Sequence, residues 1–440
     1  MPGDRPSSRR PPRTGGGSVE GPTLSAYPAD MAKVLMQRWA EAGAPPGLLP
    51  DEATCGVLLD TMYQASLLCE ESEAVRCRLV VADPEDFAPY IDGGDRQLQV
   101  LRFAAPFECT PQEVRKLSAS ASYYRAMLGV GRSVDRPLRV WGLICTGTRW
   151  VNRIEGGRFY GSNLPPNLVV QILGAGHLIA ASGYRRVLES AAGQLLLEGF
   201  DPFLSKWLPH RFRTVRAALQ PPPSDPPRPQ ISDSFVKDMA QSFVRRVLSL
   251  VRNRGHGGLL VYMPEELSDG EELDRWFRLR VQFAQDSSTL RFQQLMQRLI
   301  QRVQIIASVN DMTMVTWNDY QRMEDAELAQ LDETLIAFSH FVADLMNVDG
   351  AVVLDRSFRL IGFGGEILGD SPVHFIHRAL DLEAIESVCE PTDSGGTRHR
   401  SAYRLISGVH DAIAVVVSQD GSIRFVGFHQ NKLTYWPYLP

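Results

Sequence analysis

The sequence predicts an α/β protein with two folded units: a separate α+β domain, then a C-terminal mixed β-sheet sandwiched by helices. Two observations support this fold class. The stretch QPPPSDPPRPQ at residues 220–230 of the 440-residue chain favours an extended polyproline II spacer, which divides the chain into two units. Beyond this stretch, amphipathic helical patterns alternate with short apolar runs that are typical of buried strands.

Changes in composition set the expected domain boundaries. Residues 1–23 are rich in Pro, Gly, Ser and Arg, and we expect a disordered tail because they contain too little apolar surface to fold. A first domain is expected at residues 24–216, a proline-rich linker at 217–230 and a second domain at 231–440. Both domains fall within the usual size range.

The first domain contains both helical and strand patterns. Apolar residues at helical spacing run through residues 27–43 and 51–71, and Asp51 is the expected N-cap of the second helix. Strand patterns follow at 75–82, 138–147 and 168–183, separated by turn residues. This mixture predicts an α+β fold.

The second domain begins with an amphipathic helix at residues 232–255, which Gly255 is expected to end. Two more helices are predicted at 289–307 and 325–346. Strands are predicted at 257–264, 277–283, 349–355 and 358–364, and a hairpin at 412–426 with its turn at Asp420-Gly421.

Charge and cysteine content exclude several classes of function. The formal net charge of -5 provides no general attraction to nucleic acid or to an anionic membrane, so we expect neither as a partner. The six cysteines form no CxxC pair, which argues against a structural zinc site and a disulfide scaffold. No apolar run approaches the ~20 residues that span a bilayer. A reducing, cytoplasmic location fits best.

The stretch GGTRHR at residues 395–400 has the composition of a phosphate-binding helix start. Gly395 and Gly396 let the backbone approach a ligand closely, and Thr397 is suited to cap a helix that begins at His399. The N-terminus of a helix attracts anions, and Arg398, His399 and Arg400 add charge-assisted donors. The alternative interpretation is the start of a surface helix with a solvated basic rim.

A candidate metal ligand lies earlier in the chain, at Asp349. It stands between a predicted helix and a predicted buried strand, followed by Gly350 and Ala351, which leave room for a bulky ligand. A carboxylate suits Mg²⁺ or Mn²⁺, which often complete their coordination with water and substrate phosphate. The alternative interpretation is a residue that ends the helix or forms a turn.

Together these motifs resemble the diadenylate cyclase domain. Its two signatures are DGA and RHR, and both are intact here, as residues 349–351 and 398–400. The apolar run GGLLVY at residues 257–262 lies where that family has its first core strand, so the resemblance covers residues 232–428. The segment at 362–393 differs from the shorter loop that is common in the family, so no adenine contacts are assigned there.

The resemblance implies an enzyme that condenses two molecules of ATP into cyclic di-AMP with release of pyrophosphate. It implies that Asp349 binds the divalent metal and helps to activate the ribose 3'-hydroxyl, and that Gly350 packs against the nucleotide. Gly396, Thr397, Arg398, His399 and Arg400 would then hold the phosphates. Because each 3'-oxygen attacks the other ATP, it also implies a face-to-face homodimer, at least a transient one.

The resemblance also bears on regulation. Residues 25–215 are similar, more loosely, to the sensor region that precedes the cyclase domain in some bacterial proteins, and an unidentified small-molecule or protein signal is expected there. The alternative hypothesis is a non-catalytic nucleotide-binding sensor that transmits its bound state to a partner.

Overall fold

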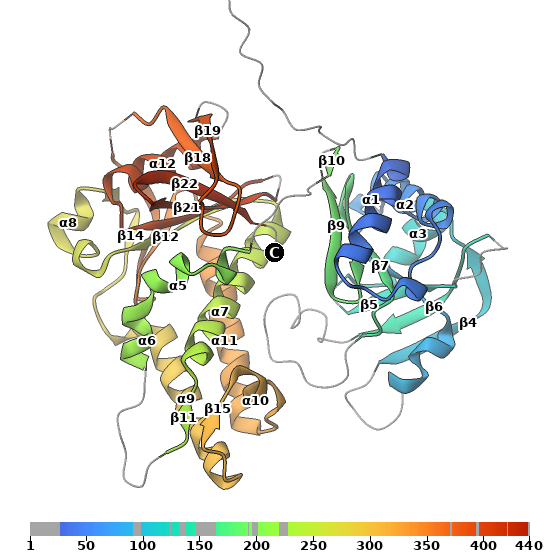
Figure 1. Cartoon of the computed structure of the whole chain (residues 1–440), viewed down its shortest axis with the longest axis horizontal. Coiled ribbons are helices and arrows are strands. Elements are labelled where there is room, and N and C mark those ends of the chain that lie inside the picture. The colour runs from blue at the N-terminus through green and yellow to red at the C-terminus, as the bar shows by residue number, and fades with distance from the viewer. Residues whose placement is uncertain are drawn as a thin grey trace, which may run out of the picture.

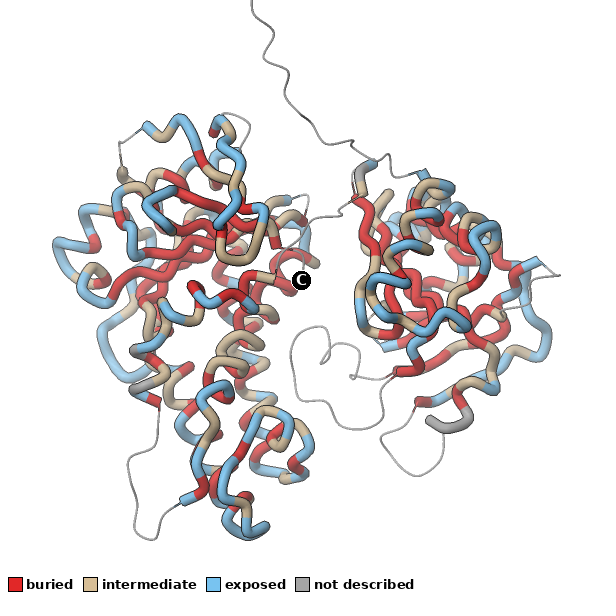
Figure 2. The backbone as a smooth tube through the Cα atoms, viewed as in Figure 1, coloured by how far each residue is buried: buried red, intermediate tan, exposed pale blue. Residues whose placement is uncertain are grey.

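The computed structural model describes eleven segments of the chain, which are residues 27–90, 98–123, 125–131, 137–146, 164–191, 193–195, 201–219, 228–369, 372–392, 396–419 and 421–438. The expected disordered tail at residues 1–23 lies outside the described residues, as do positions 220–227 of the expected linker. Figure 1 shows two lobes, each with its own sheet, and the C-terminal end lies between them. In both lobes the buried residues concentrate on the strands (Figure 2).

The first unit is built on an eight-stranded sheet of order β10-β9-β8-β7-β3-β5-β6-β4, in which β3 and β5 are parallel and the other neighbours are antiparallel. Its elements are α1 (Pro28–Glu41), η1 (Pro46–Leu48), α2 (Glu52–Ser66), β1 (Cys69–Glu70), β2 (Glu73–Ala74), β3 (Cys77–Val81), η2 (Pro84–Tyr90), β4 (Gln99–Glu108), α3 (Pro111–Ser118), β5 (Ala126–Val130), β6 (Arg139–Cys145), β7 (Leu168–Gly174), β8 (His177–Ser182), β9 (Arg185–Ala191) and β10 (Gln194–Leu195). The strands β1 and β2 form a separate ribbon.

Helices α1, α2 and α3 cover one face of this sheet and form its larger core. The expected N-cap is confirmed, because the Asp51 carboxylate accepts a hydrogen bond of 2.9 Å from the backbone N–H of Thr54. The expected strands at residues 75–82 and 138–147 are β3 and β6, and the run at 168–183 is the β7–β8 hairpin. The predicted α+β character of this unit is therefore confirmed.

The second unit is built on a mixed sheet of order β13-β17-β16-β12-β20-β21-β22-β18-β19, with β14 also paired to β17. Its elements are η3 (Pro202–Leu204), α5 (Trp207–Arg211), α6 (Arg213–Leu219), β11 (Gln230–Ile231), α7 (Asp233–Arg254), β12 (Gly258–Met263), η4 (Glu265–Leu267), α8 (Gly270–Asp274), β13 (Phe277–Arg278), β14 (Val281–Gln282), η5 (Ser287–Leu290), α9 (Arg291–Val309), β15 (Met314–Val315), α10 (Trp317–Arg322), α11 (Ala326–Leu345), β16 (Ala351–Asp355), β17 (Leu360–Ile367), β18 (Phe375–Ala379), β19 (Ser387–Pro391), α12 (Thr397–Gly408), β20 (Ile413–Val417), β21 (Ile423–His429) and β22 (Lys432–Tyr438).

The sheet is mixed because β12 runs parallel to β16, and β18 parallel to β22, whereas the other pairs are antiparallel. Alternate residues of β12 point to opposite faces, as a strand requires. Leu260 and Tyr262 pack with α7, α9 and α11, whereas Leu259 and Val261 pack with α12. The predicted mixed sheet with helices on both faces is therefore observed.

The expected end of the first domain at residue 216 needs correction. Phe203, Trp207, Leu208, Val215 and Leu219 belong to the core of the second unit. The Trp207 ring stacks on the ring of Trp436 with centroids 4.2 Å apart. Helices α5 and α6 therefore pack on the second unit, although they precede the proline-rich stretch.

Two further expectations concern element boundaries. Helix α7 ends at Gly255, which has a left-handed φ of +67°, so the predicted stop is confirmed. The single strand expected at 277–283 is instead two short strands, β13 and β14, which both pair with β17. Between them, the backbone N–H of Arg280 still donates to the carbonyl of Gly364, at 3.3 Å.

Candidate functional site

The second unit contains an open cleft of about 1110 Å³ at one end of its sheet. Because most neighbouring strands are antiparallel, the starts of β12, β16 and β21 lie at the same end as the final residues of β17 and β20. The first turns of α12 complete the cleft. Its lining residues are Leu259, Asp349, Gly350, Gly364, Gly365, Glu366, Ile367, Leu368, Gly396, Thr397, Arg398, His399, Ser401, Arg404, Ser418, Gln419, Ser422 and Arg424.

Asp349 lies in the short connection between α11 and β16, and its side chain is 96% exposed at the cleft. Gly350 follows with a φ of +107°, a conformation that side chains rarely adopt. A Cβ at this position would lie 2.6 Å from the carbonyl carbon of Gly364, so only glycine fits there. Ala351 is buried within β16 and does not line the cleft.

Helix α12 supplies the opposite wall, and its start differs from the expectation. The helix begins at Thr397, not at His399, and Gly396 is the N-cap with no side-chain capping bond. Thr397 is therefore the first helical residue, so its hydroxyl lies past the capping position. The first free backbone N–H groups of α12 lie at the cleft, where they favour an anion. Gly395 lies outside the described residues.

Asp349 and Arg398 meet across the cleft, with the Arg398 Nη2 atom 3.5 Å from the Asp349 Oδ1 atom. The two motifs are separated by 49 positions in the chain, so their contact depends on the fold. Gly257 makes room for the guanidinium, because a Cβ there would lie 3.1 Å from Arg398 Nη1. The acidic and basic motifs that the sequence singled out therefore share one cleft.

The two other members of the RHR motif lie differently. His399 is buried, and its Nε2 atom lies 3.4 Å from the Ser418 hydroxyl at the end of β20. Arg400 is exposed and does not line the cleft. In this geometry Arg398 and His399 belong to the cleft wall, whereas Arg400 lies outside it.

Several cleft residues were not predicted, above all Arg404 and Arg424. The Arg404 Nη2 atom donates to the Ser401 hydroxyl at 3.2 Å, one helical turn beyond Thr397. The Arg424 Nη1 atom donates to the Tyr403 hydroxyl at 2.9 Å, and its guanidinium lies over the ring of Tyr435. Helical spacing could have indicated Ser401, four residues after Thr397, and Arg404, three residues after Ser401. No comparable signal marks Arg424.

The charge of the cleft is predominantly positive. Arg398, Arg404 and Arg424 line it, opposite the carboxylates of Asp349 and Glu366. Burial by itself would lower the pKa of the Arg424 guanidinium, but Tyr403 and Tyr435, which lie beside it, together with Glu390, outweigh this effect and raise it. The Glu366 carboxylate forms an exposed ion pair of 3.2 Å with Arg278. The cleft is suited to a polyanionic ligand.

A divalent metal ion bound in this cleft would have the carboxylate of Asp349 as its protein ligand. The described residues contain no group of three or more His, Cys, Asp or Glu side chains placed to hold a metal. The Asp349 carboxylate is solvent-accessible and has its Arg398 contact only at 3.5 Å. Mg²⁺ commonly binds through one or two carboxylates plus substrate phosphates, so the residues present fit this mode of binding.

Comparison with known protein families gives one result. Residues 44–145 match the family described as "Probable sensor domain DACNV". The match spans η1 to β6 and lies entirely within the first unit. The first unit thus resembles a sensor domain. Comparison of the chain with curated proteins found no match, and neither did comparison with solved structures. Among the described residues, no helix is long and apolar enough to cross a membrane.

Proposed function

We propose that the second unit is a diadenylate cyclase that condenses two molecules of ATP into cyclic di-AMP and is regulated by the first unit. The observation that supports this most is the meeting of Asp349 and Arg398 in one cleft of about 1110 Å³. Ligand pockets typically measure about 300–1,000 Å³, so a nucleoside triphosphate can be accommodated. The match of residues 44–145 to a family described as a probable sensor domain supports the regulatory part.

In this proposal the triphosphate binds at the start of α12. Backbone N–H groups that follow Gly396 donate to phosphate oxygens, and the Arg398 guanidinium adds charge-assisted bonds. His399 is positioned by the Ser418 hydroxyl, from the strand β20 behind it. Arg404 and Arg424 add positive charge deeper along the same wall. Arg400 makes no phosphate contact within its own protomer.

Asp349 takes the position opposite the phosphates. A bound Mg²⁺ or Mn²⁺ ion, held by Asp349 and phosphate oxygens, would supply positive charge next to the α-phosphate. The 3'-oxygen of one ATP forms a bond to the α-phosphorus of the other, and pyrophosphate leaves. The Asp349 carboxylate orients the 3'-hydroxyl and favours transfer of its proton to a solvent water in the open cleft. Positioning and electrostatics carry such transfers, so a covalent nucleophile is not needed.

The product requires two active sites. Each 3'-oxygen must reach the α-phosphorus of a nucleotide in another cleft, and one cleft holds one properly placed triphosphate. We therefore propose a homodimer, at least transient, in which two clefts face one another across a two-fold axis. The cleft is open to solvent at the end of the sheet, as this arrangement requires.

The first test is turnover. The full chain is incubated with ATP and either Mg²⁺ or Mn²⁺, and cyclic di-AMP is measured by chromatography. Asp349→Asn should lower turnover about 100-fold or more without affecting the fold, because it removes a charge from an exposed side chain. Asp344→Asn, a change in an exposed carboxylate on α11, is the matched control and should stay active. ATP binding without product in any metal would instead favour a non-catalytic nucleotide sensor.

The second test addresses the phosphate contacts. The double variant Arg398→Ala with His399→Ala should weaken ATP binding about 100-fold, because it removes charge-assisted donors from the cleft. Arg400→Ala is the control and should bind ATP within about twofold of the unchanged chain, since Arg400 lies outside the cleft. Equal losses in both variants would contradict this assignment of the α12 residues.

A further inference from the structure

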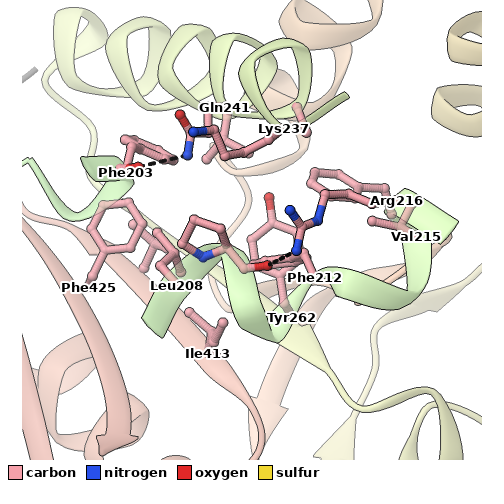
Figure 3. Close-up of a pocket in the computed structure, with 15 residues that line it drawn as sticks. Phe203, Leu208, Phe212, Val215, Arg216, Lys237, Gln241, Tyr262, Ile413 and Phe425 are labelled. Carbon is pink, nitrogen blue, oxygen red and sulfur yellow. Dashed lines mark hydrogen bonds between the residues drawn. The ribbon is translucent and has the colours of Figure 1, made fainter. Parts of the chain in front are cut away.

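A second, smaller cavity of about 50 Å³ lies on the other face of the same sheet. Residues of α5, α6 and α7 and of strands β12, β20 and β21 line it, with α7 above the other helices in Figure 3. The lining residues are Phe203, Leu208, Pro209, Phe212, Val215, Arg216, Lys237, Ala240, Gln241, Val244, Tyr262, Phe358, Ile413, Val415 and Phe425. None of them belongs to the cleft that contains Asp349.

The walls of the cavity are mostly apolar and rigidly packed. The rings of Phe212 and Tyr262 meet edge to face with centroids 5.2 Å apart, and Phe358 packs against both. Behind them, Phe203 packs on Phe425 at 5.3 Å. Interlocked aromatic rings adopt defined positions, so the space between them is part of the fold.

Two buried donors in this wall have no hydrogen-bond partner among the residues that the structure describes. The Tyr262 hydroxyl is one of them, on a side chain that is only 2% exposed. The other is the Nε atom of Arg216, whose Nη2 atom donates weakly to the carbonyl of Pro209, at 3.4 Å. Leaving a buried polar group without a partner costs about 1–3 kcal/mol. Figure 3 shows both groups in the gap between α7 and the helices below it.

The charge around the cavity is positive. Arg216 and Lys237 both line it, and they come from α6 and α7. The Nζ atom of Lys237 lies 3.6 Å from the carboxylate of Asp238, which does not line the cavity. Gln241 already donates to the carbonyl of Phe203, at 2.8 Å. The Tyr262 hydroxyl, the Arg216 guanidinium with its unused Nε donor and the Lys237 ammonium together call for an anionic acceptor.

We propose that this cavity binds a small aliphatic monocarboxylate. A planar carboxylate accepts from the Arg216 guanidinium and the Tyr262 hydroxyl together, and its alkyl chain packs among Leu208, Phe212 and Val415. One water needs about 10–15 Å³ of such space, so the cavity of about 50 Å³ corresponds to an alkyl chain of roughly three to five carbons. This site is distinct from the nucleotide cleft and does not depend on catalysis there.

The test uses the full chain without nucleotide. Straight-chain carboxylates from acetate to octanoate are titrated by calorimetry, and the primary amines of equal chain length serve as controls. Affinity should rise with chain length, reach a maximum near pentanoate and fall again when the chain exceeds the cavity, while the amines should not bind. Absence of binding at about 10 mM, equal binding of the amines, or affinity without a chain-length maximum would overturn the proposal.

Two variants locate the site. Tyr262→Phe should weaken pentanoate binding about tenfold or more, since a hydrogen bond to a charged group is lost. It should not unfold the chain, because it removes a hydroxyl without a partner. Arg216→Met should weaken binding at least as much, whereas Arg213→Met, on the exposed side of α6, is the control and should not. Unchanged affinity in Tyr262→Phe would place the carboxylate elsewhere. Because these measurements contain no ATP, they are independent of the cyclase proposal.

Discussion

At Gly350 the backbone has a φ of +107° and passes so close to β17 that a Cβ would lie 2.6 Å from Gly364. This close approach holds the preceding residue, Asp349, at the edge of the cleft. Two costs therefore oppose any side chain at this position, a strained φ and a clash with backbone atoms that cannot move away easily.

The variant Gly350→Ala tests whether the clash adds to the cost that any glycine replacement has at a positive φ. We expect it to lower the free energy of unfolding by about 3 kcal/mol and to disrupt ATP binding, since the clash displaces Asp349. Gly255→Ala is the control, because Gly255 also has a positive φ but would meet nothing within 4 Å. It should cost only about 1–2 kcal/mol and preserve binding. Urea denaturation measures both values, and equal destabilisation would contradict the close-approach argument.

Among the individual residues of the cleft, the sequence predicted those of the two motifs but not all of the others. Asp349, Arg398 and His399 are recognisable because they lie within three residues of a glycine at the boundaries of predicted elements. Thr397 was expected to cap α12, but the cap position falls one residue earlier, at Gly396. Arg424 could not be predicted, because its direction depends on the register of β21 against its neighbours.

Among the elements, α5 and α6 show how tertiary packing decides membership of a domain. They are short helices, and such helices are not stable alone. Their apolar residues are buried only because the sheet of the second unit covers them. A proline-rich stretch marks an extended segment but does not say on which side of it the core ends. The long helices α7, α9 and α11 were predicted more accurately, since each carries its own apolar face.

The assignment of α5 to the second unit leads to a stability prediction. Trp207→Ala should lower the free energy of unfolding of the second unit by about 3–5 kcal/mol, because it removes a buried ring stacked on Trp436. Leu204→Ala, in the adjacent η3 and 70% exposed, is the control and should change it by less than about 0.5 kcal/mol. Tryptophan fluorescence during urea denaturation reports the transition. If Trp207→Ala destabilised only the first unit, the corrected boundary would be wrong.

In the whole molecule, the two units meet at a buried carboxylate. Glu189 of β9 is 2% exposed, and it binds Arg252 of α7. Within the first unit, the His177 Nε2 atom and the Arg186 Nη1 atom each lie 2.7 Å from the same carboxylate. Burial by itself would raise the pKa of Glu189, but Arg252, His177 and Arg186 outweigh it and lower the pKa from 4.5 to about 2. The contact between the units is therefore electrostatic.

This shift predicts how stability depends on pH. Because the pKa is lower in the folded chain, the stabilisation is complete above pH 4.5 and is lost as the pH falls through about 2. At pH 7, Glu189→Gln should be less stable by about 3–5 kcal/mol, since it leaves Arg252 buried without its charged partner. The difference between the two proteins should decrease between pH 4.5 and 2, measured by urea denaturation. If the difference in the free energy of unfolding stayed constant between pH 4.5 and 2, the ion pair of Glu189 and Arg252 would not be the source of that difference.

The same contact lies next to the cleft that contains Asp349. The Arg252 Nε atom donates to the carbonyl of Gly421, at 2.8 Å, and Gly421 closes the turn between β20 and β21. The backbone N–H of Ser418 at the start of this turn donates to the carbonyl of Ser422, and the Ser418 hydroxyl contacts His399. A continuous set of contacts therefore joins Glu189 in the first unit to the α12 wall of the cleft.

If these contacts couple the units, Arg252→Gln should weaken ATP binding although Arg252 does not line the cleft. The variant leaves Gly421 without its donor and Glu189 without its strongest partner, so the turn that positions Ser418 loses its support. We expect a loss of about fivefold or more, which corresponds to a coupling free energy near 1 kcal/mol. Arg254→Gln is the control on the same helix, since Arg254 pairs with an exposed carboxylate, that of Asp344. Calorimetric titration with ATP compares the two variants. Equal affinities of Arg252→Gln and Arg254→Gln for ATP would show that the turn does not transmit the state of the first unit.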